Sequence, residues 1–327
     1  MKDILYIYYS IYRINNMIFK EILLCKPKYF DVIHYKLNAH MIMKNKVNYN
    51  LAIQQWRSLE ENLLNNNVKI NYIKPKKNLV DMVFSANGGI VFENKAIVSN
   101  FRAIPRKNEA KYYANYFENN GYETFPMITE FEGAGDGLFS HNKSQLWIGH
   151  GFRTDIDCKN EIEDIISNNY LDINTLKLVN PSWYHLDTCF CPFGDNNLLI
   201  YEGAFDKQSL EKIYNVYNEK DCIKVSYEDA MNFACNSISV PNNIIIGHCF
   251  SNNLKKKLKD INYNTIENNM SQFLLSGGST KCCVLDIEKK GINIAGELQY
   301  GNNDNNNNIY YHKMQSSQLD KYMPDFI

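Results

Sequence analysis

The chain has 327 residues, of which 45% are hydrophobic and 22% are charged, and its formal net charge is -1. A chain of this length can bury a large core, and its balanced charge gives no reason to expect a nucleic-acid partner. No apolar stretch approaches the roughly 20 residues of a membrane-spanning helix, so no membrane span is predicted. The nine cysteines have no regular spacing, which favours reduced thiols and a cytoplasmic protein.

The two ends of the chain differ in composition from the rest. Residues 1–19 have an apolar middle but lack a clean basic flank and a small-residue cleavage site, so we interpret them as an N-terminal extension. Residues 291–327 contain the tract GNNDNNNN, which is typical of a disordered loop or tail. One folded domain is therefore predicted over residues 20–290.

Within that domain one pattern recurs about every fifty residues, which indicates a repeat architecture. Each unit has a short apolar strand, a helix and a closing strand, and the first helix places Leu51, Trp56, Leu59 and Leu63 on one face. The apolar strands are EILLC, KAIVSNF, QLWIGHGF, NLLIYEG and NIIIGHC.

A further strand precedes four of these five apolar strands in a hairpin arrangement. The fifth such strand is KCCVLDI, residues 281–287, which comes from the far end of the domain. If it pairs with EILLC, it closes the sheets into a ring. The sequence thus predicts an α/β fold, a five-bladed propeller with pseudo-fivefold symmetry.

One polar residue stands at the same position in each of the five units. These residues are Asn87, Asp136, His185, Asn236 and Cys282, about fifty residues apart. Closed repeat folds place pockets where strand ends meet around an axis, so we expect the five side chains to converge. Polar residues start many strands, but a histidine, a carboxylate and a thiol at matching positions are more than turns require.

The segment SGGSTKCCVLDI places two adjacent cysteines after a Gly-Gly turn. Successive strand side chains point to opposite faces, so only one of Cys282 and Cys283 can reach a pocket, and the other packs as a small hydrophobe. Cys189 and Cys191 in CFC lack the second pair of a zinc motif, and we interpret them as core residues. No metal site is predicted.

Two pairs of side chains indicate the chemistry. His185 and Asp187 would share one face of a strand, and a thiol nucleophile needs such a proton shuttle with an orienting partner. Glu132 and Asp136 flank two glycines in FEGAGD, and paired carboxylates without a metal motif favour a planar guanidinium ligand.

Two arginines follow apolar strands at equivalent positions. Arg106 in FRAIPR and Arg153 in GHGFRTD could bind the negatively charged end of such a ligand, or could equally lie on the surface. Sequence spacing does not separate these alternatives.

The motifs FSANGG, SNFRAIPR, FEGAGD, GHGFRTD, YHLDTCFCPF and GGSTKC resemble those of the guanidino-modifying enzymes, the pentein or amidinotransferase superfamily. The resemblance runs from about Ile22 to Ile287 and implies a five-bladed β/α-propeller, no cofactor and a covalent thiouronium intermediate. It also implies site roles: Cys282 as nucleophile, His185 as acid and base, Glu132 and Asp187 as guanidinium-binding carboxylates, and Arg106 and Arg153 as contacts for the substrate carboxylate.

Asn87 separates branches of this superfamily. Arginine deiminases and dimethylarginine dimethylaminohydrolases carry an aspartate there, whereas the arginine dihydrolases, which this chain resembles more closely, have an asparagine there and another in a segment like LNAHM, here Asn38. Those enzymes take arginine past citrulline to ornithine, ammonia and carbon dioxide. A neutral amide tolerates the uncharged ureido group of citrulline, where an aspartate would demand a cation.

The sequence therefore predicts a cysteine-dependent hydrolase of arginine or a close derivative. Its expected partner is a small guanidino substrate, and a homo-oligomer is left open. The alternatives are an enzyme that stops at citrulline, a citrulline ureohydrolase, an amidinotransferase, and a catalytically silent relative that binds an amino acid or a protein.

Overall fold

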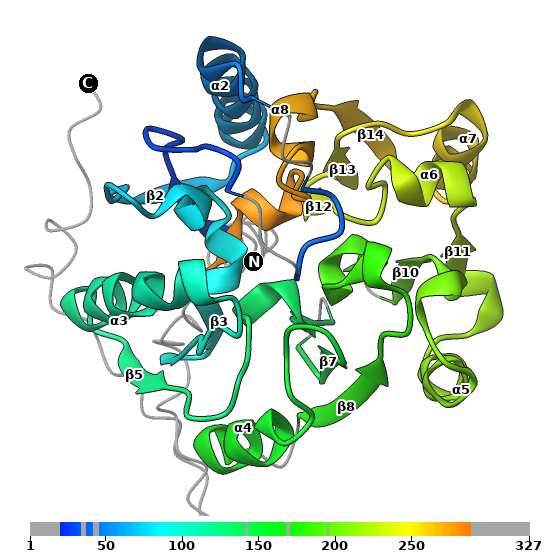
Figure 1. Ribbon diagram of the computed structural model, residues 1–327. Coiled ribbons are helices and arrows are strands. Elements are labelled where there is room, and N and C mark those ends of the chain that lie inside the picture. The colour runs from blue at the N-terminus through cyan, green and yellow to red at the C-terminus, as the bar shows by residue number, and fades with distance from the viewer. Residues whose placement is uncertain are drawn as a thin grey trace, which may run out of the picture. The chain divides into compact units, whose positions relative to one another are not determined.

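The structure is a computed structural model that describes residues 20–33, 37–41, 46–140, 143–167, 171–194 and 196–288. Within these ranges the chain forms five three-stranded sheets. Figure 1 shows the sheets around a common axis, with the longer helices outside them. The five-bladed α/β propeller predicted from the sequence is confirmed. The predicted N-terminal extension and asparagine-rich segment lie outside the described residues.

All five sheets have the same topology. A central strand pairs antiparallel with a hairpin strand on one side and parallel with the closing strand on the other. The central strands are β1 (Glu21–Cys25), β4 (Lys95–Val98), β7 (Gln145–His150), β10 (Asn197–Ile200) and β13 (Ile244–Gly247). The parallel partners are β2 (Lys69–Ile73), β5 (Glu123–Pro126), β8 (Asp172–Lys177), β11 (Cys222–Lys224) and β14 (Asn264–Glu267). The antiparallel partners are β15 (Leu285–Asp286), β3 (Gly89–Phe92), β6 (Gly137–Phe139), β9 (Phe190–Phe193) and β12 (Ile238–Val240).

A helix crosses from each central strand to its parallel partner. These helices are α2 (Tyr49–Asn65), α3 (Ala110–Asn119), α4 (Cys158–Ile166), α5 (Lys207–Val216) and α7 (Asn252–Asp260), and two shorter ones are α6 (Tyr227–Met231) and α8 (Ser271–Leu274). Helix α2 begins where the Asn48 side chain accepts a hydrogen bond from the Leu51 amide. Of its predicted apolar face, Trp56, Leu59 and Leu63 are buried in the core with residues of the sheet strands, whereas Leu51 is only half-buried.

The predicted ring closure is confirmed by the pairing of β1 with β15. Leu23 lies opposite Leu285 and Ile22 lies opposite Asp286 in an antiparallel ladder. Asp286 also pairs with Lys20 at 3.0 Å and with Lys281 at 3.1 Å. The last strand of the domain thus completes the sheet that the first strand begins.

Short 3-10 turns precede four of the five hairpin strands, and here the sequence-based strand assignments were too long. Lys281–Cys283 and Leu186–Thr188 are 3-10 turns, so neither the two cysteines nor His185 and Asp187 lie on strands. The reason is that only the last few residues of each hairpin strand have a ladder partner. Side chains in a 3-10 turn diverge by about 120° per residue, so adjacent cysteines still point in different directions.

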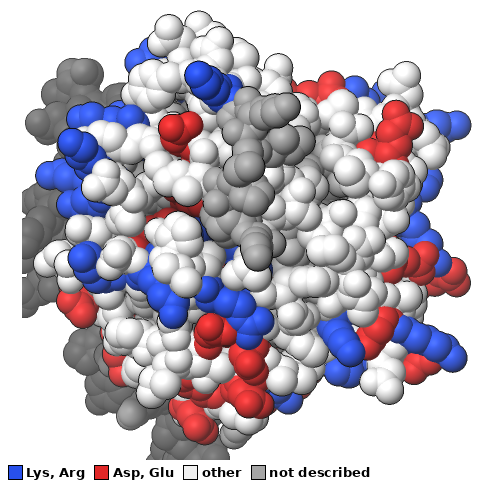
Figure 2. Space-filling view, in the orientation of Figure 1, with Lys and Arg blue, Asp and Glu red and all other residues white. Residues whose placement is uncertain are grey.

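Charged side chains of both signs are interspersed over the face shown in Figure 2. This agrees with the net charge of -1. Among the residues that the structure describes, no helix combines the length and the apolar character needed to cross a membrane.

Helix α2 provides a test of the packing. We expect Leu59→Ala to lower the free energy of unfolding by about 2–5 kcal/mol, because the side chain is fully buried and its removal leaves a cavity. Leu64→Ala in the same helix, at a side chain that is 52% exposed, should change it by less than about 0.5 kcal/mol. Urea denaturation measures both, and equal effects would contradict the assigned helix face.

Candidate active site

The five matched polar residues come together at the centre of the ring. Asn87, Asp136, His185, Asn236 and Cys282 are all buried, with exposed fractions of 4% or less. The Asn236 amide donates to the Cys282 sulfur at 3.1 Å, and Nε2 of His185 lies 4.0 Å from Asp136. The predicted convergence is therefore observed.

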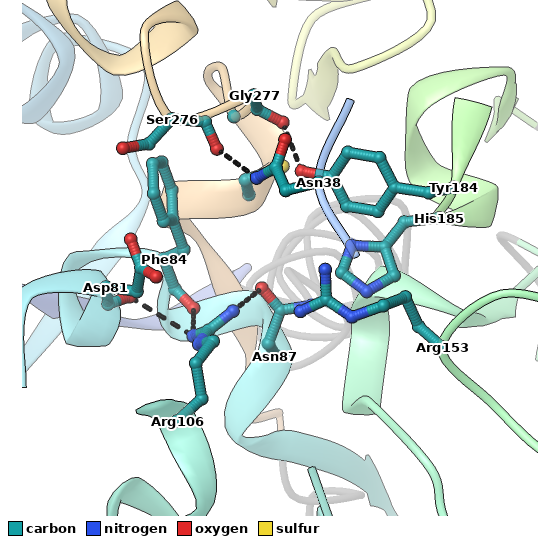
Figure 3. Close-up of a pocket in the computed structure, with 12 residues that line it drawn as sticks. Asn38, Asp81, Phe84, Asn87, Arg106, Arg153, Tyr184, His185, Ser276 and Gly277 are labelled. Carbon is teal, nitrogen blue, oxygen red and sulfur yellow. Dashed lines mark hydrogen bonds between the residues drawn. The ribbon is translucent and has the colours of Figure 1, made fainter. Parts of the chain in front are cut away.

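A pocket opens at this centre (Figure 3). Six of the predicted site residues line it: Asn38, Asn87, Arg106, Arg153, His185 and Cys282. Glu132, Asp136 and Asp187 are buried behind the wall. The three carboxylates predicted for the site each lie within 4.0 Å of a side chain that lines the pocket.

Cys282 is held by two neighbours from other repeats. Its thiol donates to Oδ2 of Asp187 at 3.2 Å, and its backbone amide donates to Oδ1 of Asn236 at 3.2 Å. Burial and the adjacent Asp187 carboxylate raise the pKa of the Cys282 thiol well above its ordinary value. Burial raises the pKa of Asp187 to about 7, although the thiol hydrogen bond opposes this. The thiol is therefore protonated. Cys283 is fully buried and does not line the pocket.

The Glu132 carboxylate contacts two other side chains of the site, Arg153 and His185. One carboxylate oxygen accepts from Nε of Arg153 at 2.9 Å, and the other lies 2.8 Å from Nη2 of Arg153 and 2.9 Å from Nε2 of His185. Burial opposes ionisation, but Arg153 and His185 outweigh it and lower the pKa of Glu132. The carboxylate therefore stays charged and orients the imidazole.

His185 is neutral in this setting. Burial lowers the pKa of His185 to about 4, with Arg153 acting in the same direction, and the hydrogen bond with Glu132 opposes the shift only in part. A neutral imidazole that donates from Nε2 keeps Nδ1 as a proton acceptor. The arrangement suits a general base held in one orientation.

Asp136 stabilises the turn that carries the histidine. Its carboxylate accepts from the Leu186 amide at 3.0 Å and from the Thr154 hydroxyl at 2.7 Å. Asp136 does not line the pocket. The structure places it in a supporting position rather than at the ligand-facing position expected from FEGAGD.

Asn87 and Arg106 contact one another in the wall. Nη1 of Arg106 donates to Oδ1 of Asn87 at 2.7 Å, and Nδ2 of Asn87 donates to the Glu132 carbonyl at 3.1 Å. Arg106 also forms a two-point ion pair with Glu109, at 3.0 and 2.8 Å. Gly135 is required beside this pair, because a Cβ there would lie 2.2 Å from Nδ2 of Asn87.

Asn38 ties two loops over the pocket. Its Nδ2 donates to the Ser276 carbonyl at 2.8 Å, and its Oδ1 accepts from the His40 amide at 3.1 Å. A Cβ on Gly277, whose φ is +69°, would lie 2.8 Å from the same Oδ1. The segment GG therefore allows the close approach that the loop contact needs.

Six lining residues were not predicted: Asp81, Phe84, Tyr184, Ser276, Gly277 and Gly278. The Tyr184 hydroxyl donates to the Gly277 carbonyl at 2.8 Å, and its ring lies 5.2 Å from the Arg153 guanidinium carbon. Asp81 could have been identified from the sequence, because it is a carboxylate within the otherwise apolar segment DMVF.

Among the described residues, no three or more His, Cys, Asp or Glu side chains are placed to hold a metal ion. Cys189 and Cys191 are buried, and their thiols contact the backbone carbonyls of Leu186 and Ser237. Their predicted packing in the core is confirmed.

The fold and the converging polar groups are those of the pentein superfamily. The family model of the eukaryotic N,N dimethylarginine dimethylhydrolases matches residues 31–289, and the chain belongs to that family.

Two characterised relatives carry different activities in their names. The chain is 36% identical over 270 residues to the bifunctional arginine dihydrolase/ornithine cyclodeaminase ArgZ of Synechocystis sp., covering 82% of this chain but only 37% of that protein. It is 30% identical over 261 residues to the N(G),N(G)-dimethylarginine dimethylaminohydrolase of Mycobacterium tuberculosis, covering 80% and 84% of the two chains.

Solved structures of the ArgZ N-terminal domain are similar to this fold. A cysteine-to-serine variant bound to its substrate superposes with a TM-score of 0.79 and 35% identity, covering 83% of this chain and 98% of that domain. An asparagine-to-serine variant covalently bonded to a reaction intermediate has the same TM-score and 34% identity.

The histidine gives a direct test of the electrostatics. We expect the His185 imidazole to stay neutral until the pH falls to about 4, because burial and Arg153 disfavour the cation. NMR of protein with labelled histidine, with the signal assigned by His185→Gln, measures the midpoint. A midpoint near the ordinary value of 6.5 would show that the site is more hydrated or more negative than its geometry indicates.

Proposed function

We propose that this protein hydrolyses the guanidino group of L-arginine through a covalent adduct on Cys282, and that it carries the reaction to ornithine, ammonia and carbon dioxide. The observation that carries the proposal is the Cys282 thiol on Asp187 in a pocket that also presents neutral His185 and Asn87. The chain spans about a third of the curated ArgZ protein, so the proposal concerns the hydrolase reaction alone.

A cationic substrate would activate the thiol. A guanidinium that replaces the Cys282 thiol as the hydrogen-bond partner of Asp187 pairs with the carboxylate and favours the thiolate, which is the reactive form. The thiolate then attacks the guanidinium carbon, and ammonia leaves with a proton. We assign Asp187 as the guanidinium-binding carboxylate.

We assign His185 as the group that moves protons. Its Nδ1 can accept a proton from the attacking water or return one to the leaving nitrogen. Glu132 fixes the ring through the 2.9 Å contact at Nε2, so its proposed role is to orient His185 rather than to bind guanidinium directly. Asp136 supports the same turn.

The other end of the substrate would meet charges of both signs. Arg153 lines the pocket and is the proposed contact for the α-carboxylate. Asp81 lines it as well and could pair with an α-ammonium group. Asn38 would hold the loop above them.

The second hydrolysis is favoured by Asn87. Deimination leaves a neutral ureido group, and an amide can donate to its oxygen, whereas an aspartate only accepts. The ArgZ domain, an arginine dihydrolase, was captured with its substrate after a cysteine change and with a covalent intermediate after an asparagine change. Both residue types face the pocket here, as Cys282 and Asn87.

Dimethylarginine hydrolysis is the second candidate. The family model and the Mycobacterium tuberculosis relative favour it. Asn87 argues against it, because that activity is associated with an aspartate at this position in the resembling enzymes. Assaying arginine and dimethylarginine side by side separates the two, and a protein that binds but turns over neither would be a silent relative.

The remaining proposals concern the domain boundaries, the location of the protein and its cofactor requirement. Residues 20–290 form the catalytic domain, with residues 1–19 as an N-terminal extension and residues 291–327 as an asparagine-rich segment. The protein acts in the cytoplasm on a small guanidino molecule without a cofactor.

Two adjacent cysteines allow a matched test of the nucleophile. Cys282→Ser should abolish turnover, because a serine hydroxyl is not ionised near neutral pH. Cys283→Ser should keep most activity, since that side chain does not line the pocket. Steady-state ammonia release measures both, and loss of activity in Cys283→Ser alone would overturn the assignment.

The product distinguishes a dihydrolase from a deiminase. We expect wild type to convert labelled arginine to ornithine, and Asn87→Asp to release mostly citrulline. An aspartate would pair with Arg106 and with the guanidinium but could not donate to the ureido oxygen, at a cost of about 1–3 kcal/mol. Mass spectrometry of the products decides, and citrulline as the only wild-type product would refute the second hydrolysis.

A further inference from the structure

Arg106 is enclosed by acceptors from its own part of the chain. Nε and Nη2 contact the two oxygens of Glu109, and Nη2 also donates to the carbonyls of Asp81 and Phe84 at 3.1 and 3.2 Å. The guanidinium lies 4.7 Å from the Phe101 ring centre. Arg106 is 3% exposed and Glu109 is fully buried. The cation is therefore fixed in place before any ligand arrives (Figure 3).

This fixed cation determines which way the Asn87 amide faces. Arginine can only donate hydrogen bonds, so the atom 2.7 Å from Nη1 must be the amide oxygen. A backbone carbonyl can only accept, so the atom 3.1 Å from the Glu132 oxygen must be the amide nitrogen. A flipped amide would place donor against donor and acceptor against acceptor. The orientation is thus set by two independent contacts.

We propose that Glu109 and Arg106 form a positioning pair that holds Asn87 as a hydrogen-bond donor to the pocket and thereby selects the neutral ureido intermediate for a second hydrolysis. This inference rests on the proposed function. Glu109 is a positioning residue, because it acts through Arg106 and does not line the pocket.

The chemical basis is the difference between the two substrates of the proposed reaction. The guanidinium of arginine carries only donors, so the second N–H of Asn87 has nothing to pair with there. The ureido group of citrulline offers an oxygen in place of one nitrogen, and the same N–H can donate to it. A donor fixed at this wall of the pocket therefore favours the binding of citrulline over that of arginine. Asp187 is the group that pairs with the guanidinium of arginine.

The competing role for Arg106 is to clamp the substrate carboxylate, as the family resemblance implies. A clamp acts on a group that arginine and citrulline share. Weakening it would raise KM for both substrates alike. The positioning role instead predicts a loss confined to the second substrate, and this difference can be measured.

The test uses Glu109→Gln, which keeps the side-chain shape but replaces one of the two carboxylate oxygens that accept from Arg106. We expect kcat/KM for citrulline to fall about tenfold, ~1.4 kcal/mol, with kcat/KM for arginine changed less than about twofold. Free citrulline should then accumulate during arginine turnover. Glu130→Gln, in the more exposed pair of Glu130 with Arg102, is the matched control and should leave the product ratio unchanged.

Each outcome decides one question. Equal losses for both substrates, or an unchanged product ratio in folded Glu109→Gln, would overturn the positioning role and leave the proposed function intact. A wild type that forms no ornithine from either substrate refutes the proposed function, and the inference with it. If Glu109→Gln does not fold, as judged by its Tm, Glu109→Asp keeps the charge but cannot reach both contacts. It should show the same selective loss for citrulline, and equal losses would again overturn the inference.

Discussion

The buried Glu132 carboxylate is the constraint on which the site depends. A charge removed from water is tolerated only when close partners and hydrogen bonds replace the lost hydration. Arg153 and His185 provide that replacement from two other segments of the chain. Arg153 and His185 are themselves buried. If either side chain moved away, the Glu132 carboxylate would lose a partner in a low-dielectric interior. The same contacts therefore hold the repeats together and fix the orientation of the imidazole.

The ring explains how five repeats can build one site from different side chains. Each repeat ends its polar turn at the centre, so a single position per repeat is enough to bring an amide, a carboxylate, a histidine and a thiol together. Symmetry supplies the convergence, and the differences between repeats supply the chemistry. Asn236 illustrates this, because its amide holds both the backbone and the sulfur of Cys282 without lining the pocket itself.

Much of the architecture could be predicted because it follows from local pattern. Apolar runs predicted the central strands. The segment at residues 281–287 has no apolar strand following it in the sequence, and this predicted that it pairs with β1 and closes the ring. The 3-10 turns were missed, since three residues carry too little periodicity to be distinguished from a strand. The partners of Glu132 also could not be predicted, because they lie 21 and 53 positions away in the chain and meet only in the folded ring. The pairing of Glu109 with Arg106 could have been predicted from the sequence, because Glu109 follows Arg106 by three residues in a helical turn.

The charge balance around Cys282 differs between the two halves of the proposed reaction. Burial, and then the Asp187 carboxylate beside it, raise the pKa of the Cys282 thiol, so the thiol keeps its proton. An arriving guanidinium neutralises that carboxylate, so the substrate itself promotes its own attack. Citrulline brings no charge, and the second attack must then begin from a protonated thiol. The proton has to pass to a neutral base in the same pocket, and His185, whose pKa is lowered to about 4, is a weak acceptor there. We therefore expect the second hydrolysis to be slower than the first. The hydrogen bond from Asn87 to the ureido group then determines whether citrulline is released or hydrolysed.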